Sequence, residues 1–523
     1  MRRSFLVTLL FFVAPACSLP SESESGFPEA LAADGKERKL ARAQELYELH
    51  CSVCHGVTGR GDGEAAPFLF PPARRFATGR FRLVSSQNGA PFDRDLVATL
   101  RRGVPGSAMP GWGWLAEEDL WALADYVRFL AVEGLREDLA ESARRANDPL
   151  LLAESERIAH ARLTPNRALK VALTVPTGEA TLAHGKGVFL QHCAQCHAAD
   201  GTGEPEPRLD EDETLNWARD FTAGFLKGGD SPRELAYRIR AGMPGTAMPP
   251  TELSPGDEAD LIAYVRSLIP EGTAERLVHR RETLEVRRVE RAPLGPDEAA
   301  WAAAEEISVV LAPLWWNPEA VHEAQLAALH DESELALRLS WEDESGIVRL
   351  FSEGTSIDAA ALQLSDAPQP PLFGMGSPHA PTNLWHWQAL RLEDVAGALD
   401  LIELVPHALR PNRPEAARAD VPLYQRLLGR LEPSDQVDRI TVAGVESIAA
   451  AERVPSEVHA NARWQEGRWS VVFHRPLHPG GEGQIALVPG QSLQVACAVW
   501  NGAAGDGGAR KSISIWQELV LAR

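Results

Sequence analysis

The chain has 523 residues, which is too long for one hydrophobic core, so we expect two to four domains. Its composition, 44% hydrophobic and 24% charged, is ordinary for globular proteins. A net charge of −21 argues against binding to nucleic acid, which requires a basic face, and suits a surface that attracts small or basic partners.

The N-terminus has the pattern of an export signal. The basic segment Met1–Arg3, with two arginines, precedes a short apolar run, Phe5–Val13, and a small-residue cleavage site, Ala14–Ala16. The apolar run is too short to remain as a membrane-spanning helix. We therefore expect a periplasmic protein with a signal peptide at 1–17. Cys17 has two open interpretations: a lipidated first residue that anchors the protein to the membrane, or an incidental cysteine after ordinary secretory cleavage.

The motif Cys-x-x-Cys-His occurs twice, as "CSVCH" from Cys51 and "CAQCH" from Cys193. This is the attachment signature of c-type haem, because two thiols one turn apart form thioethers with the vinyl groups and the adjacent histidine reaches the iron. The motif predicts two covalent haem c groups. The residues concerned are Cys51, Cys54 and His55 in the first copy, and Cys193, Cys196 and His197 in the second.

The surroundings of the motif are duplicated as well. Short amphipathic helices, "ARAQELYELH" and "AHGKGVFLQH", lead into the two motifs. Downstream, "RRGVPGSAMPGW" and "RAGMPGTAMPPT" place Met109 opposite Met248, about 140 residues apart, and Val104 opposite Met243. The helical segments "EEDLWALADYVRFL" and "DEADLIAYVRSLI" follow, with acidic residues in the first turn. The pattern predicts a duplicated, all-α domain.

This order of helix, haem motif, methionine loop and helix resembles the class I cytochrome c fold. The resemblance implies that His55 and Met109 are the iron ligands of the first haem, and His197 and Met248 those of the second. Methionine with histidine raises the haem potential. Met243 is the weaker candidate, because its counterpart in the first copy is a valine.

Beyond Pro270 the pattern changes to strands. Segments such as "ELALRLSW", "GRWSVVFHRPL", "SLQVACAVWNG" and "KSISIWQELVL" alternate with period two between Gly and Pro turns, which predicts a mainly β sandwich. Ten of the 14 tryptophans lie beyond residue 300, and we expect most of them in its core. Cys497 shares an apolar alternation with Val495 and Val499, which predicts a buried, inert thiol.

The segments "FGMGSPHAPTNLWHWQA", "WQEGRWSVVFHRPL", "VACAVWNG" and "ARKSISIWQEL" resemble the b-haem domain of the ethylbenzene dehydrogenase gamma-subunit family. Its relatives include electron-transfer subunits of type II dimethyl sulfoxide reductase enzymes and domains that accompany nitrite oxidoreductases. The resemblance implies one non-covalent haem b, held by Met375 and Lys511. A ligating lysine must lose its proton, and lysine does so on burial far more readily than arginine. The competing ligands are His379, His386, His407, His459, His474 and His478.

The predicted organisation is a multidomain chain, with two all-α cytochrome c domains followed by a mainly β sandwich haem-binding domain. Its parts are a signal peptide (1–17), a flexible tether (18–36), cytochrome c domain 1 (37–135), a spacer (136–175), cytochrome c domain 2 (176–272), a charged linker (273–299) and the b-haem domain (300–523).

We expect an electron-transfer subunit with no catalytic residues. By resemblance, it would relay electrons between the iron–sulfur and molybdopterin subunits of an oxidoreductase and a soluble cytochrome c or terminal oxidase. Two alternatives stay open at this point. One is a dihaem enzyme of the peroxidase or thiosulfate-oxidising type, and the other is a stand-alone lipoprotein electron shuttle whose β domain binds no haem.

Overall fold

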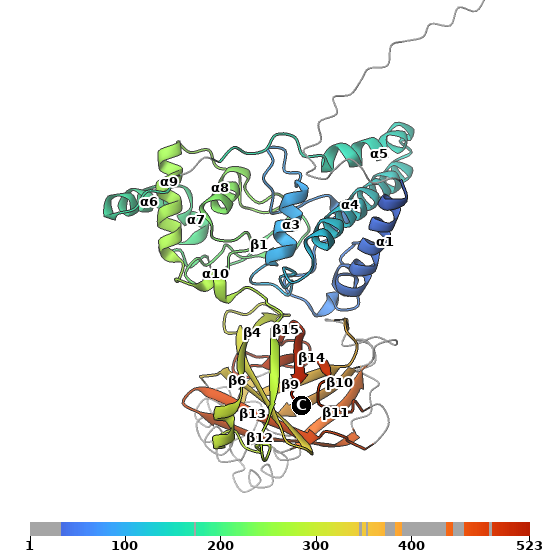
Figure 1. Cartoon of the computed structure of the whole chain (residues 1–523). Coiled ribbons are helices and arrows are strands. Elements are labelled where there is room, and N and C mark those ends of the chain that lie inside the picture. Colours follow the sequence, from blue (N-terminus) through green and yellow to red (C-terminus); the bar gives the residue numbers. More distant parts are fainter. Residues whose placement is uncertain are drawn as a thin grey trace, which may run out of the picture.

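The computed structural model describes residues 33–171, 174–204, 206–344, 348–351, 354–371, 382–389, 436–442, 454–480 and 484–523. The predicted signal peptide, Cys17, Met375, His379 and His407 lie outside these residues. The helical and β parts occupy opposite ends of the molecule, with the C-terminus in the β part (Figure 1). No helix among the described residues combines the length and apolar character needed to cross a membrane.

The first helical domain is built around two helices that pack together. Its elements are α1 (Ala33–His50), α2 (Ser52–His55), η1 (Ala66–Phe68), η2 (Phe76–Thr78), α3 (Asp93–Arg102), α4 (Glu117–Ala146) and α5 (Pro149–Leu163). Tyr47 of α1 packs on Tyr126 of α4, with ring centroids 5.2 Å apart. Helix α5 falls within the segment assigned to a spacer, but it packs along α4 and buries Ala159 and Leu163 in the core of this domain.

The second helical domain repeats this plan. Its elements are α6 (Glu179–His192), α7 (Ala194–His197), β1 (Arg208–Leu209), β2 (Leu215–Asn216), α8 (Pro232–Ala241), α9 (Pro255–Leu268) and α10 (Thr273–Arg276). Phe189 and Tyr264 pack at 5.4 Å, in the manner of Tyr47 and Tyr126. Ser231 and Ser254 cap α8 and α9 by accepting hydrogen bonds from backbone amides, and a proline begins each helix.

The β domain is one twelve-stranded sheet. Its strands are β3 (Thr283–Arg288), β4 (Glu306–Pro313), β5 (Glu323–His330), β6 (Glu334–Glu342), β9 (Ala359–Ser365), β10 (Thr382–Gln388), β11 (Gln436–Val442), β12 (Val454–Gln465), β13 (Arg468–Pro476), β14 (Ser492–Trp500), β15 (Ser512–Ser514) and β16 (Gln517–Leu521). The 3-10 helix η3 (Ala299–Ala303) precedes β4, and β7 (Val348–Phe351) and β8 (Gly354–Ile357) pair as a separate two-stranded sheet.

The strands expected to form a sandwich are joined into a single ring. Strand β15 pairs with both β4 and β14, and β5 pairs with β6, so the sheet closes on itself. Alternate side chains face inward, where Trp341, Trp385, Trp387 and Trp469 form the centre of the core. Cys497 is buried in this core, as expected.

Strand β3 lies inside the segment assigned to a charged linker. Leu284 and Val286 are fully buried, whereas Glu285 between them and the other residues of the strand are exposed, so a charged sequence still supplies one apolar face. The strand pairs with β16 in parallel and tethers the chain to the β domain as soon as it leaves α10. The high charge of this segment predicted a linker, whereas the segment forms a strand of the sheet.

Candidate haem sites

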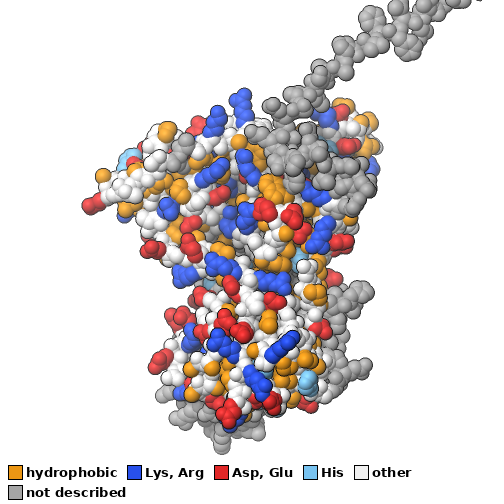
Figure 2. Space-filling view, in the orientation of Figure 1, with side chains coloured by type: hydrophobic (Ala, Val, Ile, Leu, Met, Phe, Trp, Pro, Cys, Tyr) orange, Lys and Arg blue, Asp and Glu red, His pale blue; other side chains and the backbone are white. Residues whose placement is uncertain are grey.

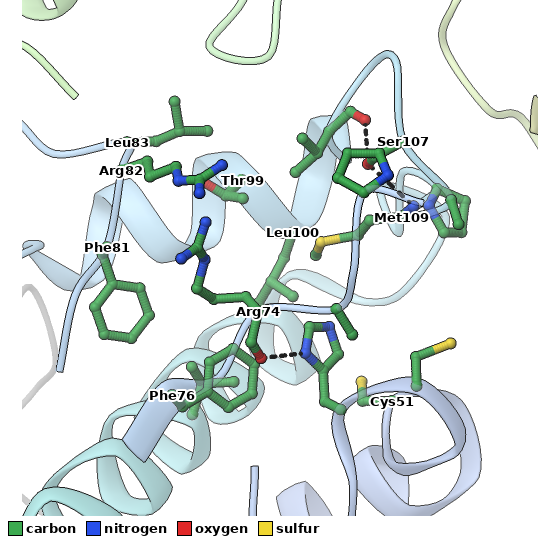
Figure 3. A pocket seen from close by; sticks show the side chains of 18 of the residues that line it. Cys51, Arg74, Phe76, Phe81, Arg82, Leu83, Thr99, Leu100, Ser107 and Met109 are labelled. Carbon is green, nitrogen blue, oxygen red and sulfur yellow. Dashed lines mark hydrogen bonds between the residues drawn. The ribbon is translucent and has the colours of Figure 1, made fainter. Parts of the chain in front are cut away.

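The first haem motif opens onto a cavity between α1, α3 and the methionine loop. Cys51, Cys54, His55 and Met109 all line this cavity, which has a volume of about 190 Å³. Figure 3 shows the sulfur of Met109 pointing into the space between its loop and Arg74, with Cys51 at the opposite wall. The structure thus brings together the four residues that the sequence singled out in the first copy.

The second motif opens onto an equivalent cavity. Cys193, Cys196, His197 and Met248 line it together, and its volume is about 230 Å³. Apolar groups make up most of the surface of both cavities, and each cavity presents two thiols, an imidazole and a thioether. This donor set fits a covalently attached haem with histidine and methionine ligands.

Both predicted histidine ligands are oriented in the same way. His55 Nδ1 lies 2.9 Å from the carbonyl oxygen of Arg74, and His197 Nδ1 lies 2.9 Å from that of Arg219. A ring whose Nδ1–H donates to a carbonyl keeps Nε2 as the free lone pair for a metal. Burial lowers the pKa of both histidines, which favours the neutral form that a ligand requires.

The phenylalanine two residues beyond each of these arginines stacks on the ligand histidine. The centroid distances are 4.7 Å for His55 and Phe76, and 4.6 Å for His197 and Phe221. The sequence analysis missed this feature. The signal was present as a further match between the copies, "ARRFATG" beginning at Ala73 and "ARDFTAG" beginning at Ala218.

The two methionine loops are folded by the same hydrogen bonds. The amide of Met109 donates to Ser107 Oγ at 3.3 Å, and that of Met248 donates to Thr246 Oγ1 at 3.2 Å. A glycine closes each loop in a positive-φ conformation: a Cβ on Gly103 would lie 2.5 Å from the backbone of Pro110. Met243 donates its amide to the carbonyl of Met248 and lines both cavities.

The third predicted site lies on the outer face of the β domain. Lys511 immediately precedes β15, and its ammonium lies 5.0 Å from the ring centroid of Trp500. His386 packs against the same indole at 5.2 Å. Burial lowers the pKa of Lys511 to about 8, which moves it toward the neutral form needed of a ligand.

The face around Trp500 is formed by small side chains. Ala359 and Ala361 of β9 and Ala498 of β14 pack around Trp500, with Leu384 of β10 beside them. Small residues leave space for a flat group to lie against a sheet. The predicted partner Met375 lies outside the described residues, so its role as a ligand stays a prediction.

Three of the competing histidines lie away from this position. His459 and His474 form a pair with centroids 5.6 Å apart on the neighbouring strands β12 and β13, and His478 is exposed. Among the competing histidines that the structure describes, His386 is the one packed against the indole that Lys511 also contacts.

The three regions meet at two adjacent tryptophans, Trp315 and Trp316, which follow β4. Trp315 packs on Phe70 of the first helical domain, with centroids 5.2 Å apart. The ring centroid of Trp316 lies 5.1 Å from that of Phe225 in the second domain, and the guanidinium carbon of Arg219 lies 5.8 Å from it.

Backbone hydrogen bonds also join the first helical domain to the β domain at this point. The amide of Phe70 donates to the carbonyl of Leu314, whose own amide donates to the carbonyl of Lys511, both at 2.9 Å.

Family models match all three regions. Residues 38–127 match the cbb3-type cytochrome c oxidase subunit III family, residues 182–268 match cytochrome c, and residues 298–512 match ethylbenzene dehydrogenase. The chain consists of two cytochrome c domains and an ethylbenzene dehydrogenase-type domain. The cytochrome c domains imply covalent haem c, and the chain is accordingly a haem-containing electron-transfer protein.

Individual proteins show the same similarity. Cytochrome c55X of Stutzerimonas stutzeri is 36% identical over 100 residues, which cover 19% of this chain and 74% of that protein. A candidate respiratory nitrate reductase heme subunit of Haloferax mediterranei is 23% identical over 231 residues, covering 43% of this chain and 67% of that protein. A chain of the reducing HAO-like protein complex of Kuenenia stuttgartiensis is 27% identical. The match covers 44% of this chain and 96% of that chain, with a TM-score of 0.37.

Proposed function

We propose that the protein is an exported, periplasmic electron-transfer subunit with two haem c groups and one haem b. It relays electrons between the iron–sulfur and molybdopterin subunits of an oxidoreductase and a soluble cytochrome c or terminal oxidase. The names of the Haloferax and Kuenenia proteins support an oxidoreductase complex as the partner. Attachment to the membrane through a lipid on Cys17 is part of the proposal.

The observation that carries the proposal is the junction at Trp315 and Trp316. The loop that lines the first haem cavity is hydrogen-bonded through Leu314 to the backbone of Lys511, and Trp316 contacts the arginine whose carbonyl orients His197. One short segment of the ethylbenzene dehydrogenase-type domain thus contacts a part of the chain that contributes to each of the three candidate sites. This arrangement suits a relay, because it holds successive redox groups at fixed separations.

Each residue at the cytochrome sites has a defined task in this proposal. Haem iron supplies one-electron chemistry by alternating between its ferric and ferrous states. The cysteines would attach the group covalently, and the histidine and methionine of each site would both bind its iron. An iron held by two protein side chains would have no open site for a substrate, which favours electron transfer over the dihaem peroxidase alternative.

The test is a haem count on the mature protein purified from a host able to attach haem c. A pyridine haemochrome spectrum should show two haem c groups, which resist extraction, and one extractable haem b. Two haem c groups without haem b, even when haem is supplied during expression, would contradict the three-haem relay. The remaining interpretation would be a dihaem cytochrome with a β docking domain.

A further inference from the structure

The two cytochrome cavities share part of their walls. Arg82, Lys227 and Met243 line both cavities, Arg74 lines the first, and Arg219 lines the second. We call Arg74, Arg82, Arg219 and Lys227 the shared basic cluster. Figure 3 shows Arg74 and Arg82 side by side at one edge of the first cavity.

Contacts between the domains fix the shared basic cluster in place. Arg82 of the first domain forms an ion pair with Asp210 of the second, and Arg74 binds Asp212 at 2.9 Å. Arg238 of α8 donates hydrogen bonds to the backbone carbonyls of Arg82 and Val84. The positions of the basic groups therefore do not depend on flexible surface side chains.

The protein supplies too little negative charge for this cluster. Asp210 and Asp212 pair with two of its members, whereas Lys227 and Arg219 form no ion pair with any described residue. Burial lowers the pKa of Lys227 well below its ordinary value, and the neighbouring Arg219, Arg82 and Arg74 lower it further, against the smaller opposite effect of Asp210. Burial also lowers the pKa of Arg74 and of Arg219 to about 10. Buried cations without counter-charges are costly, so a site of this kind calls for anions from elsewhere.

We infer that the shared basic cluster binds propionate carboxylates of both c haems, with Lys227 and Arg82 as the contacts common to the two. The inference rests on the proposed content of two covalent haems. Each haem carries two propionates. A haem attached at each motif would therefore bring two carboxylates into each cavity. Lys227 is the informative residue, because it faces both cavities and the one carboxylate that acts on it, Asp210, is already paired with Arg82.

The cluster could instead serve only to hold the domains together. That role accounts for Arg74 and Arg82, which pair with acidic residues across the interface. It leaves Lys227 unexplained, because a buried lysine without an acidic partner opposes folding. Binding of propionates from both sides accounts for the lysine as well as for the arginines.

The inference has a functional consequence. A positive charge near a haem favours the reduced state, so one lysine between two haems raises both potentials at once. Propionates that meet at one cluster also place an edge of each haem toward the other. Electron transfer between the two cytochrome domains then occurs across this wall, and reduction of one haem lowers the potential of the other through the charge they share.

The test is Lys227→Met in the full chain, with potentiometric titration of both c haems. We expect the two midpoint potentials to fall together. Lys227→Arg keeps the charge and should restore both potentials, and Lys186→Met removes an exposed lysine of α6 and should change neither. Resonance Raman bands of the propionates of both haems should also shift in Lys227→Arg, which gives a readout that does not require loss of the charge.

The outcomes separate the inference from the proposed function. Fewer than two covalent haems in the wild-type protein would overturn both. Two haems whose potentials stay unchanged in Lys227→Met, or of which one alone moves, would overturn the shared site and leave the electron-transfer function standing. Parallel shifts in Lys227→Met and Lys186→Met would show a general charge effect and would also overturn it.

Discussion

The ring of Phe70 lies 5.2 Å from the indole of Trp315 and 5.5 Å from that of Trp217, so one side chain joins the two cytochrome domains to the β domain. We expect Phe70→Ala to destabilise the protein by about 1–3 kcal/mol, because each aromatic pair contributes roughly 0.5–1.5 kcal/mol beyond its buried area. Urea unfolding followed by tryptophan fluorescence would measure this. Phe68→Ala is the matched control, because Phe68 is 43% exposed; equal losses in both variants would contradict the assigned contact.

The methionine ligand of the second haem is predicted to be Met248 rather than Met243. Met248→Leu should abolish the methionine–iron charge-transfer band of one haem and lower its potential by roughly 0.2 V, within the ~0.8 V range that axial ligands set. Met243→Leu should keep the band, although Met243 lines both cavities. Loss of the band in Met243→Leu alone would reverse the assignment.

Lys511 is predicted to hold haem b as a neutral amine. Lys511→Arg keeps a cation but removes the ligand, because arginine does not lose its proton. We expect extractable haem b to disappear in Lys511→Arg and in Met375→Leu, with both haem c groups retained. The exposed Lys186 provides the control, and Lys186→Arg should keep all three haems. Haem b that survives in both variants would favour His386, which packs on the same indole.

Much of this arrangement could be predicted from the sequence because it depends on local patterns. The haem motifs, the methionine loops and the flanking helices are contiguous segments, and their duplication made each copy a check on the other. The β content was visible from alternation. Strand β3 was missed because its exposed face is charged, so its composition resembles that of a linker although it pairs with β16 on one side and β5 on the other.

The contacts between domains could not be predicted from these patterns. Trp315 and Trp316 are adjacent in the sequence, but their side chains contact different cytochrome domains. Lys227 has no motif around it, and its meaning depends on which cavities lie on its two sides. Such relationships depend on how separate domains pack, which no single stretch of sequence specifies.

The crossing of α6 and α9 requires glycine at position 185. A Cβ there would lie 2.1 Å from the carbonyl oxygen of Asp260, which is a backbone atom that cannot rotate away. We expect Gly185→Ala to destabilise the second cytochrome domain by about 1–3 kcal/mol through overpacking. Gly187→Ala in the same helix meets nothing within 4 Å and should instead stabilise by up to about 1 kcal/mol through helix propensity. Urea unfolding followed by circular dichroism distinguishes the two signs.

The loop that leads to Lys511 contains a buried carboxyl, Asp506, which accepts a hydrogen bond from the amide of Asn501 at 3.0 Å. Burial raises the pKa of Asp506 from 3.8 to about 6. The folded state therefore binds this proton more tightly than the unfolded state, and the contribution of Asp506 to stability falls as pH rises from about 4 to about 6. Asp506→Asn keeps an acceptor for Asn501 without a charge, so we expect the variant to gain stability relative to the wild type over this range, reaching about 3 kcal/mol at pH 7. The measurement is the difference in unfolding free energy between the two proteins at several pH values, which cancels the titration of all other groups. A difference that does not change between pH 4 and 7 would show that the carboxyl is hydrated in the folded protein.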